Sequence, residues 1–450
     1  MKPVPVIAIF DVGKTNKKLF LFDEHYRIVF ERTARFLETT DEDGEPCENL
    51  ESLRLSIFDS LREVFRMPEF NIRAINFSTY GASLVYVDQQ GNPIAPLYSY
   101  LKPFPENLKE KFYTTYGGET KVANETASPV LGSLNSGMQL YRFKYEQPER
   151  FKKLKYALHL PQYLSSLISG TFCSEITSIG CHTGLWDFNR AAYHDWVSKE
   201  GLLDKLAPIC PSTQVLDACF PGNNYAVGTG LHDSSAALIP YLASFTESFI
   251  LLSTGTWCIS MNPFNDSVLT EEELSQDCLC YLQYVGTPVK ASRVFSGYEH
   301  EQQEKRIIAH FKEEKSRYKD LELDESVIAD LRKRPNTNSD FATRDLADFA
   351  TGVEAYHQLV LDLVNKQVQS TNLVLDGTPV KRIFVDGGFS KNGIFMNLLA
   401  SAYPDIEVFA ASMAQATAVG TALAIHQSWN TKPMPTDLIE LKYYSNARFV

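Results

Sequence analysis

The stretch Asp11-Val-Gly-Lys-Thr-Asn-Lys-Lys18 separates two apolar runs near the start of the chain. Residues 4–10 before it are rich in valine and isoleucine, and Leu19-Phe-Leu-Phe22 follows it directly. Short runs of branched and aromatic residues are typical of buried strands. We therefore expect a strand, a polar turn and a second strand, with Gly13 giving the turn its backbone freedom.

The turn carries groups that can bind an anion. Thr15 and Asn16 offer side-chain donors beside backbone N–H groups, an arrangement able to hold a phosphate. Lys14, Lys17 and Lys18 add positive charge to a chain that is acidic overall. Taken alone, the stretch is more commonly an ordinary hairpin with solvated lysines. The Walker A spacing G-x-x-x-x-G-K-[ST] is absent.

A second unit of the same kind lies in the other half of the chain. Ser248-Phe-Ile-Leu-Leu252 predicts a strand, Ser253-Thr-Gly-Thr256 a turn rich in hydroxyls, and Trp257-Cys-Ile-Ser-Met261 another strand. This recurrence indicates two related α/β domains that offer a hairpin each to the same phosphate chain. A length of 450 residues also exceeds what one hydrophobic core usually organises. We predict domains at residues 1–240 and 241–450.

Between the two units lies Val227-Gly-Thr-Gly-Leu-His-Asp-Ser-Ser-Ala-Ala-Leu238, in which two glycines precede His232 and Asp233. The small residues that follow predict the start of a helix. An Asp at this junction can cap the helix, and the helix dipole favours its carboxylate by roughly 0.3–1 kcal/mol. For an isolated Asp, a plain N-cap is the common explanation. The alternative is an ionised general base aimed into a cleft.

The C-terminal half also contains a nucleotide-type turn. Arg382–Val385 predicts a strand, Asp386-Gly-Gly-Phe-Ser-Lys-Asn392 a turn with paired glycines, and Ile394–Ala402 a helix. Glycines let the backbone lie flat against a base or sugar, and a helix N-terminus favours anions. The G-x-G-x-x-G spacing of dinucleotide sites is absent. In the N-terminal half, either a ligand or simple turn chemistry accounts for the small-residue turn Ser78–Ser83.

Composition argues against several classes of function. The net charge of −12 disfavours nucleic-acid binding as the main role. No segment is apolar for long enough to span a bilayer, and the apolar run at the N-terminus is too short for a signal peptide. The 8 cysteines include no C-x-x-C pair, as expected for reduced thiols in a cytoplasmic protein.

In their order along the chain, these motifs resemble the FGGY family of carbohydrate kinases, part of the actin, hexokinase and hsp70-like ATPase superfamily. The first hairpin is similar to the family's Asp-x-Gly-Thr-Thr-x-x-Arg motif, and Leu252-Ser-Thr-Gly-Thr-Trp257 to its second phosphate motif. Gly230-Leu-His-Asp233 resembles the catalytic segment, and residues 386–392 resemble the adenosine motif Gly-Gly-Gly-x-x-x-Asn. Leu160-Pro-Gln-Tyr-Leu164 resembles a further family segment. The resemblance covers essentially the whole chain. It implies two ribonuclease H-like, actin/hexokinase-type α/β domains with a cleft between them.

Within the family, the motifs are most similar to the rhamnulokinase and fuculokinase branch. This similarity implies a ketose substrate such as rhamnulose or fuculose, which are 6-deoxy-ketoses.

Two departures from the family pattern concern the ligands. Lys14 and Lys18 stand where the family often has Thr or Ser and Arg, so positive charge survives without bidentate guanidinium geometry. Tyr98-Ser-Tyr-Leu-Lys-Pro103 stands where the family often has a Trp/Tyr-x-Asp-x-Arg element, and it holds neither Asp nor Arg. Those two groups commonly hold sugar hydroxyls, so the departure bears on substrate identity more than on chemistry.

The resemblance implies transfer of the ATP γ-phosphoryl group to a sugar hydroxyl whose proton Asp233 accepts. A free Asp has a pKa of about 3.9, so we expect this base to be ionised at neutral pH. Mg²⁺ would bridge the phosphates and contact Asp11 through water. The implied sugar-binding residues are Gly81, Ala82, Tyr98 and His232, the last with a structural histidine as its alternative. The implied ATP- and phosphate-binding residues are Gly13, Thr15, Asn16, Lys18, Thr254, Gly255, Thr256, Gly387, Gly388 and Asn392.

Two alternatives stay open beside the ketose kinase. One is a pentulose or polyol kinase. The other is a member of the superfamily that senses ATP or sugar without turnover, which the altered first hairpin and the missing Asp and Arg motivate. The expected partners are a small-molecule sugar and ATP, with neither nucleic acid nor membrane, and a homodimer is one possible assembly.

Overall fold

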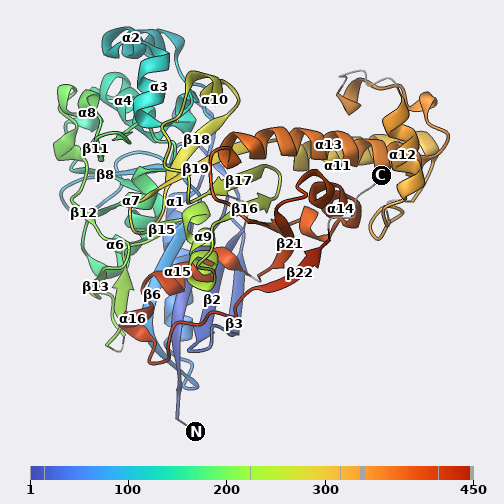
Figure 1. The fold of residues 1–450 in the computed structure, drawn as a ribbon. Helices are drawn as coiled ribbons and strands as arrows, with labels where there is room; N and C mark the ends of the chain where they lie inside the picture. The colour runs from blue at the N-terminus through green and yellow to red at the C-terminus, as the bar shows by residue number, and fades with distance from the viewer. Residues whose placement is uncertain are drawn as a thin grey trace.

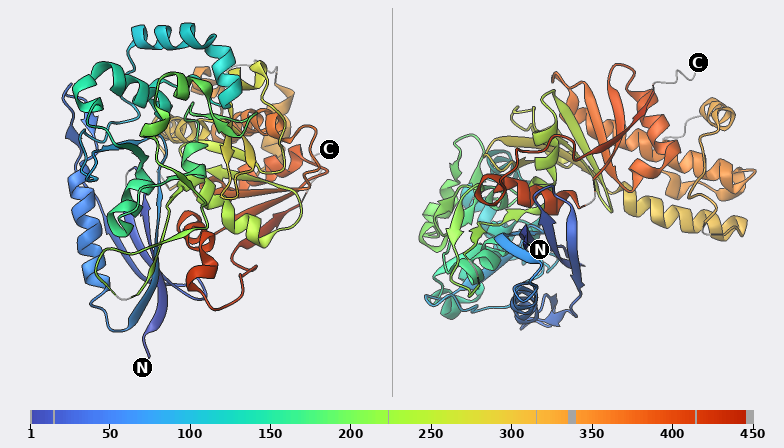
Figure 2. Two further views of the ribbon diagram at one scale, coloured as in Figure 1. Left: turned by 90° about the vertical axis from the view of Figure 1, so that its left-hand side faces the viewer. Right: turned by 90° about the horizontal axis from the view of Figure 1, so that it is seen from below.

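The computed structural model describes residues 2–14, 16–222, 224–314, 316–334, 340–413 and 415–445. Two α/β domains, each built on a 7-stranded sheet, meet around helices α9 and α15 at the centre of the molecule (Figure 1). Viewed from below, the first sheet and its helices form one lobe, and the second sheet with the long helices forms the other (Figure 2). The predicted fold of two α/β domains is confirmed.

The first sheet has the strand order β13-β14-β6-β1-β2-β3, with β15 also paired to β6. Strands β1, β2 and β3 are antiparallel neighbours, β6 runs parallel to β1, and β14 runs parallel to β6. The strands are β1 Val4–Val12, β2 Lys17–Asp23, β3 Ile28–Ala34, β6 Phe70–Thr79, β13 Val215–Asp217, β14 Ala226–Gly228 and β15 Leu231–His232.

The second sheet repeats this topology. Strands β16, β17 and β19 are antiparallel neighbours, β20 runs parallel to β16, and β21 runs parallel to β20. The predicted recurrence of one strand–turn–strand unit in each half is thus part of a larger repeat. The strands, in sheet order, are β18 Cys278–Leu282, β19 Pro288–Val294, β17 Cys258–Asn262, β16 Phe249–Thr254, β20 Arg382–Gly387, β21 Glu407–Ser412 and β22 Glu440–Tyr444.

The helices and short strands surround these sheets. The helices are α1 Leu50–Val64, α2 Glu106–Tyr116, α3 Glu119–Thr126, α4 Ser136–Glu146, α5 Pro148–Phe151, α6 Leu160–Ser169, α7 Ile176–Ile179, α8 Asp195–Lys199, α9 Asp233–Ser244, α10 Glu271–Ser275, α11 Ser296–Phe311, α12 Glu325–Lys333, α13 Gly352–Leu375, α14 Gly393–Ala402, α15 Ala416–Ala424 and α16 His426–Trp429. The short strands are β4 Thr39–Thr40, β5 Pro46–Cys47, β7 Leu84–Val87, β8 Tyr156–His159, β9 Ser174–Glu175, β10 Trp186–Asp187, β11 Ala192–Tyr193 and β12 Ile209–Cys210.

The central strand β1 is buried on both faces, which explains its continuous apolar sequence. Val6 and Ala8 pack into the core shared with α1 and α6, whereas Ile7 and Ile9 pack into the core shared with α9 and α15. Successive side chains of a strand point to opposite faces, so one strand serves both cores. The sheet therefore has a helical layer on each side.

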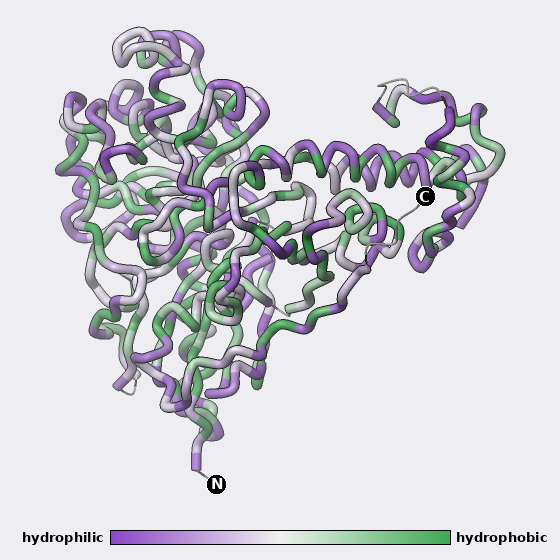
Figure 3. The backbone as a smooth tube through the Cα atoms, in the orientation of Figure 1, coloured by the Kyte–Doolittle hydropathy of each residue, from purple (hydrophilic) through white to green (hydrophobic). Residues whose placement is uncertain are grey.

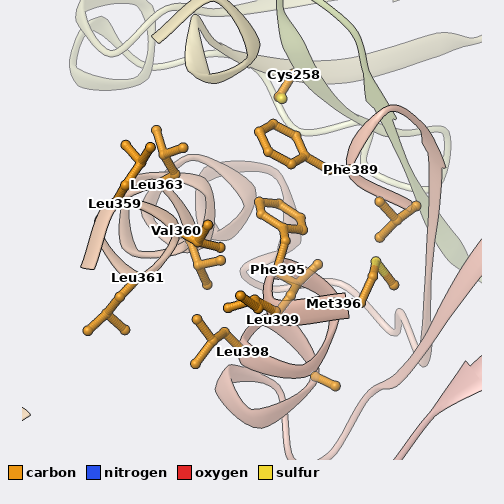
Figure 4. Packing of buried hydrophobic residues seen from close by; sticks show 14 of the residues in the cluster. Cys258, Leu359, Val360, Leu361, Leu363, Phe389, Phe395, Met396, Leu398 and Leu399 are labelled. Carbon is orange, nitrogen blue, oxygen red and sulfur yellow. The ribbon is translucent and has the colours of Figure 1, made fainter. Parts of the chain in front are cut away.

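The core of the second domain lies between its sheet and the helices α11, α13 and α14. The rings of Phe389 and Phe395 stack at 4.4 Å between centroids, and Leu359 and Leu363 of α13 pack into the same cluster (Figure 4). Hydrophobic and hydrophilic residues alternate along α13 (Figure 3), as expected for a helix with one buried side. Among the described residues, no helix has the length and apolarity needed to cross a bilayer.

Helix α9 is packed against both sheets. Ala236 and Ile239 contact the core of the first sheet, and Leu238 and Tyr241 contact that of the second. On α15, a Cβ added to Gly420 would lie 1.8 Å from the Ala236 carbonyl oxygen, so the two helices cross with their backbones in contact. The start of α9 is therefore held at the junction of the domains. The boundary expected at residues 240 and 241 falls inside this helix and stays a prediction.

Candidate active site

The first predicted phosphate turn is shorter than the sequence suggested. Strand β1 runs to Val12 and β2 begins at Lys17, so Asp11 and Lys18 are paired strand residues and lie outside the turn. Within the turn, the Gly13 N–H donates to the Asn16 carbonyl oxygen at 3.0 Å. Thr15, predicted to bind phosphate, lies outside the described residues.

The side chains around this turn are already engaged with the protein. Asn16 Oδ1 accepts a hydrogen bond from Arg35 Nε at 2.9 Å, and Lys18 Nζ lies 3.1 Å from Glu31 Oε1. Lys14 Nζ lies 5.7 Å from the ring centroid of Tyr100. The positive charge of Lys18, which was expected to bind phosphate, is therefore partly balanced by Glu31. Lys14 lies against the Tyr98–Lys102 segment.

In the second phosphate turn, Thr254 plays a different part from Gly255 and Thr256. The buried Thr254 hydroxyl donates to the Asp386 carbonyl oxygen at 2.5 Å and accepts from the Phe389 N–H at 3.0 Å. These two bonds join the hairpin to the end of β20. Gly255 and Thr256 are exposed, and a Cβ on Gly255 would meet no atom closer than 3.8 Å. The open part of the turn is therefore Gly255–Thr256.

The start of helix α11 packs on this open turn, a feature that the sequence analysis missed. A Cβ on Gly297 would lie 1.8 Å from the Gly255 carbonyl oxygen, and the Tyr298 N–H donates to the Thr256 carbonyl oxygen at 3.1 Å. The buried Ser296 hydroxyl has no partner among the described residues. Free N–H groups at a helix start favour an anion. In the sequence, the pair Ser296-Gly297 at the start of this polar helix is the feature that could have predicted this contact.

The paired glycines of the adenosine-type turn meet the second hairpin. Gly387 has φ +93°, and a Cβ there would lie 2.0 Å from the Thr254 carbonyl oxygen. The Gly388 N–H donates to that oxygen at 2.8 Å. The glycines thus serve the close docking of the two turns, in addition to any role toward a nucleotide.

Asn392 follows these glycines as the N-cap of α14. Its Oδ1 accepts from the Phe395 N–H at 3.0 Å, and its Nδ2 donates to the Tyr356 hydroxyl at 2.9 Å. His300 Nε2 of α11 lies 2.9 Å from the same hydroxyl. The structure therefore gathers α11, α13 and α14 around Asn392.

Asp233 is the first residue of α9 and not its N-cap, which is His232 without a side-chain capping bond. Asp233 Oδ1 accepts from the Ser234 N–H at 2.7 Å. Burial raises the pKa of Asp233 to about 6. The sequence prediction of an unperturbed, dipole-stabilised carboxylate was therefore incomplete, because burial outweighs the helix dipole here.

Asp11, at the end of β1, is the electrostatic neighbour of Asp233. Burial, followed by the negative charge of Asp233, raises the pKa of Asp11 to about 6, against the opposing effects of Ser78 and Lys18. The Ser78 hydroxyl donates to Asp11 Oδ1 at 3.1 Å. Because the charge of Asp233 disfavours ionisation of Asp11, a cation placed beside them would favour the charged form of Asp11.

These carboxylates fit the predicted Mg²⁺ by their chemistry. Mg²⁺ commonly binds one or two protein carboxylates and completes its shell with water and substrate phosphates. No group of three or more His, Cys, Asp or Glu side chains that could hold a metal by itself occurs in the described part of the chain. Asp11 therefore suits a metal that a nucleotide brings, and not a metal caged by protein.

His232 lies between Asp233 and a buried wall. Its Nε2 is 3.1 Å from Asp233 Oδ1, and its ring stacks on Tyr281 at 5.7 Å between centroids. Burial lowers the pKa of His232 to about 3, so the ring is neutral. The hydrogen-bond partner of Nε2 is Cys181 Sγ at 3.1 Å, so Nε2 lies between a thiol and the Asp233 carboxylate. The buried Nδ1 has no partner among the described residues.

Gly81 and Ala82 lie in the turn against this histidine. A Cβ on Gly81 would lie 2.8 Å from Cys181 Sγ and 3.0 Å from the His232 ring. Ala82 has φ +59°, and its carbonyl oxygen accepts from Gln139 Nε2 at 2.6 Å. Backbone held in the left-handed region by outside contacts is frequent at binding sites. Cys181 and Tyr281, which complete this wall, carried no signal in the sequence.

Tyr98 is the predicted sugar residue that the structure separates from the others. Its hydroxyl bonds to Glu42, and it lines a pocket with Lys102, Gln139 and Arg142 that includes neither Gly81 nor Asp233.

Two residues further on, Tyr100 lies 5.7 Å from Lys14 Nζ, measured from its ring centroid. Burial raises the pKa of Tyr100, and the charges of Lys14 and Asp233 both act on it. Lys102, at the position of the family's Arg, is buried and ion-paired with Asp41 and Asp43 at 2.5 and 2.6 Å. Tyr100 is therefore the residue of this segment that faces the site.

Two models of protein families match the chain, one in each half. Residues 6–239 match the N-terminal domain of the FGGY family of carbohydrate kinases, and residues 246–433 match the carbohydrate kinase FGGY C-terminal domain. The chain is 23% identical over 286 residues to a rhamnulokinase from Mannheimia succiniciproducens, a match that covers 59% of this chain and 57% of that protein. A rhamnulokinase from Halalkalibacterium halodurans is 25% identical over 264 residues, covering 55% and 52%. The chain thus spans little more than half the length of these curated relatives.

Solved structures share the fold over nearly the full length. A carbohydrate kinase from Novosphingobium aromaticivorans superposes with a TM-score of 0.81 at 22% identity, covering 98% of this chain and 94% of that one. A xylulose kinase from Lactobacillus acidophilus gives a TM-score of 0.78 at 14% identity, covering 98% and 93%. With the two domain matches in sequence order, the chain belongs to the FGGY family of carbohydrate kinases.

Proposed function

We propose that the protein transfers the γ-phosphoryl group of ATP to a hydroxyl of a ketose such as rhamnulose or fuculose, with Asp233 as general base. The observation that carries this proposal is the pair Asp11 and Asp233, each with a pKa near 6, at the helix start that both sheets hold. Phosphoryl transfer depends mainly on positioning and charge neutralisation, which such a junction supports.

Asp233 accepts the proton of the attacking hydroxyl as its bond to phosphorus forms. A base with a pKa near 6 is mostly ionised at neutral pH and is closer to the operating pH than a free Asp. His232 Nε2 lies 3.1 Å from Asp233 Oδ1, and the buried, unpartnered Nδ1 forms a hydrogen bond with a sugar hydroxyl. Gly81 packs directly against this ring, since a Cβ there would lie 3.0 Å from it, and so keeps the ring in position.

On the nucleotide side, Gly255 and Thr256 of one hairpin and the Gly13–Asn16 turn of the other hold the β- and γ-phosphates. Gly387, Gly388 and Asn392 seat the adenosine. Mg²⁺, held by Asp11 through water, would supply neutralisation of phosphate charge. We assign these roles to two domains, residues 1–240 and 241–450, that close on the substrates and exclude water.

The sugar is the least constrained part of this proposal. The rhamnulokinases among the relatives support a 6-deoxy-ketose at low identity only. A pentulose or polyol kinase requires the same phosphate chemistry. A protein that senses ATP or sugar without turnover is a separate candidate, and the pairing of Lys18 with Glu31 favours it because that cation is partly neutralised.

A coupled assay of ADP release decides between these candidates. It is run with Mg·ATP and a panel of L-rhamnulose, L-fuculose, D-xylulose, L-ribulose and glycerol. Turnover of a deoxyketulose above the others supports the main proposal, and turnover of a pentulose or glycerol supports the alternative kinase. ATP binding with no turnover of any acceptor would favour the sensor.

A further inference from the structure

A short hairpin, residues 39–48, lies beside the first phosphate turn and has no role in the function proposed above. Its two strands, β4 and β5, are paired antiparallel. Asp41 closes the turn between them, because its Oδ1 accepts from the N–H groups of Asp43 and Glu45 at 2.9 and 3.0 Å. An Asp side chain that bonds to the backbone just after it stabilises a turn. The hairpin is therefore held in shape by its own contacts.

The end of this hairpin is joined to the phosphate turn by a buried ion pair. Glu48 and Lys17 are 7% and 8% exposed, and Lys17 Nζ lies 3.2 and 3.1 Å from the two carboxylate oxygens of Glu48. Lys17 Nζ also donates to the Lys14 carbonyl oxygen, within the turn, at 2.7 Å. Glu48 Oε1 lies 3.5 Å from Lys14 Nζ as well. The Lys17 ammonium, expected to add charge for a phosphate, thus contacts the backbone of the turn.

Glu48 is fixed on its other side by the chain around it. Its backbone forms an antiparallel β-bridge with Leu97, the residue before the segment 98–102. The next residue, Asn49, is the N-cap of α1, and its side chain accepts from the Ser52 N–H at 2.9 Å. The carboxylate that pairs with Lys17 is therefore anchored to α1 and to a neighbouring segment of the first domain.

A second buried ion pair lies at the other end of the hairpin. The buried Lys102 Nζ lies 2.5 Å from Asp41 Oδ2 and 2.6 Å from Asp43 Oδ2. Asp41 is also the residue that closes the hairpin turn. One hairpin thus carries two buried ion pairs, and only the pair of Lys17 with Glu48 reaches the phosphate turn.

The free energy of a buried ion pair points to a role beyond stability. Taking two charges out of water costs about as much as their attraction returns, and apolar residues of similar size often stabilise a protein equally well. An apolar pair lacks the bond from Lys17 to the Lys14 carbonyl oxygen, which orients the backbone of the turn. Phosphate binding by such a turn depends on the direction of its N–H groups.

We propose that Glu48 and Lys17 are positioning residues that hold the turn of residues 13–16 in the form that binds the ATP phosphates. This inference rests on the proposed role of that turn in phosphate binding and adds the residues that shape it. Glu48 holds the Lys17 ammonium, and the ammonium holds the Lys14 carbonyl. Both side chains act on the nucleotide through the backbone of the turn.

Binding and stability of two variants test this role without turnover. Glu48→Gln leaves the Lys17 ammonium buried without its charge partner, so it should lower the urea midpoint of unfolding. It should also raise the Kd for Mg·AMP-PNP about 10-fold, as loss of one hydrogen bond to a charged group does. In the double variant Lys17→Met/Glu48→Gln, the midpoint should return toward that of wild type, whereas the Kd should stay raised. Calorimetric titration measures each Kd.

AMP distinguishes positioning of the turn from a general structural effect. It lacks the β- and γ-phosphates, so its Kd should be unchanged in the double variant. Lys102→Met/Asp41→Asn removes the other buried ion pair of the same hairpin and is the matched control, since Asn also closes such a turn. It should leave the Kd for Mg·AMP-PNP unchanged. Lys152→Met/Glu149→Gln, an exposed pair, should change neither binding nor stability.

The outcomes separate this inference from the kinase proposal. A stable double variant that binds AMP-PNP weakly and AMP normally upholds the positioning role, whether or not any sugar is turned over. A wild-type Kd for AMP-PNP, equal weakening of AMP, an equal effect of the Lys102 and Asp41 control or failure of the double variant to fold overturns it and leaves the kinase. A wild-type protein that binds no nucleotide overturns both.

Discussion

At the scale of single residues, Asp233 is subject to two opposing effects. The N-terminus of α9 favours its charged form by no more than about 1 kcal/mol. Burial at the domain junction acts in the opposite direction and prevails, so the pKa rises to about 6. The pKa of the neighbouring Asp11 is also raised, first by burial and then by the negative charge of Asp233. The result is a carboxyl group that is mostly ionised at neutral pH and gains its proton near pH 6.

This gives the activity a defined pH dependence. Since the deprotonated form of Asp233 accepts the proton, kcat/KM should be level between pH 7 and 8 and should fall about tenfold per pH unit well below pH 6. The check is a pH profile of kcat/KM for the sugar with ATP saturating. A profile that stays level down to pH 5 would show that no carboxyl with a raised pKa acts as the base.

Gly81 offers a second residue-scale prediction. A Cβ at this position would lie 2.8 Å from Cys181 Sγ and 3.0 Å from the His232 ring. Gly81→Ala should therefore displace the ring and raise the KM for the sugar about 10-fold, with the KM for ATP unchanged, as overpacking of about 1–3 kcal/mol predicts. Adding Cys181→Ala removes the nearest atom and should recover part of the loss. No recovery in the double variant would contradict this packing explanation.

The sequence predicted the site residues that lie within motifs. It did not predict the residues that the fold brings to the site from elsewhere in the chain. Asp11, Asp233 and Gly81 were predicted because a turn, a helix start and a small-residue stretch mark them locally. The engagement of Thr254 with the end of β20 could not be predicted, because its partner lies 132 residues away. Tyr98 stays a predicted sugar residue, and Tyr100 was not singled out, since a local pattern does not say which of two alternating side chains faces the site.

At the scale of elements, the crossing of α9 and α15 positions the site. The two helices meet where Gly420 faces the Ala236 carbonyl, so the predicted catalytic base begins a helix whose backbone is locked against another. The sequence indicated the start of α9. It did not indicate that α15, near the C-terminus, packs on the first sheet, because that contact depends on the path of the whole chain.

Gly420→Ala tests the crossing. Its Cβ would lie 1.8 Å from a backbone oxygen, so the helices must separate, and the free energy of unfolding should fall by about 1–3 kcal/mol or more. Urea denaturation followed by circular dichroism measures this change. Gly393→Ala in α14 is the matched control, because a Cβ there meets no atom within 4 Å. Equal midpoints for the two variants would argue against a close-packed crossing.

At the scale of the whole molecule, one five-stranded topology occurs twice, with α9 and α15 between the two copies. The strand–turn–strand units made this repeat predictable from sequence, since each carries its own apolar runs and glycine. The mutual placement of the copies was not predictable, because it arises from contacts such as that of the Tyr241 hydroxyl on α9 with Asp386 Oδ2 of β20, at 2.9 Å.

Closure about this junction is expected on substrate binding. Small-angle X-ray scattering should give a smaller radius of gyration with the sugar and Mg·ADP together than with neither, since the domains exclude water around the phosphates. Asp233→Asn should close to the same extent, because it loses chemistry and keeps binding. Identical scattering curves with and without the ligands would contradict a hinged closure.

The assignment of Asp233 as general base is tested most directly by the turnover of Asp233→Asn. With the sugar that wild-type protein turns over best, kcat should fall by about 10²–10⁴-fold, the usual contribution of a general base. The affinity for ATP should remain near that of wild type, since the lost interaction belongs to the transition state. Asp217→Asn, an exposed change on β13, should leave turnover unaltered. Turnover of Asp233→Asn close to that of wild type would contradict the central claim.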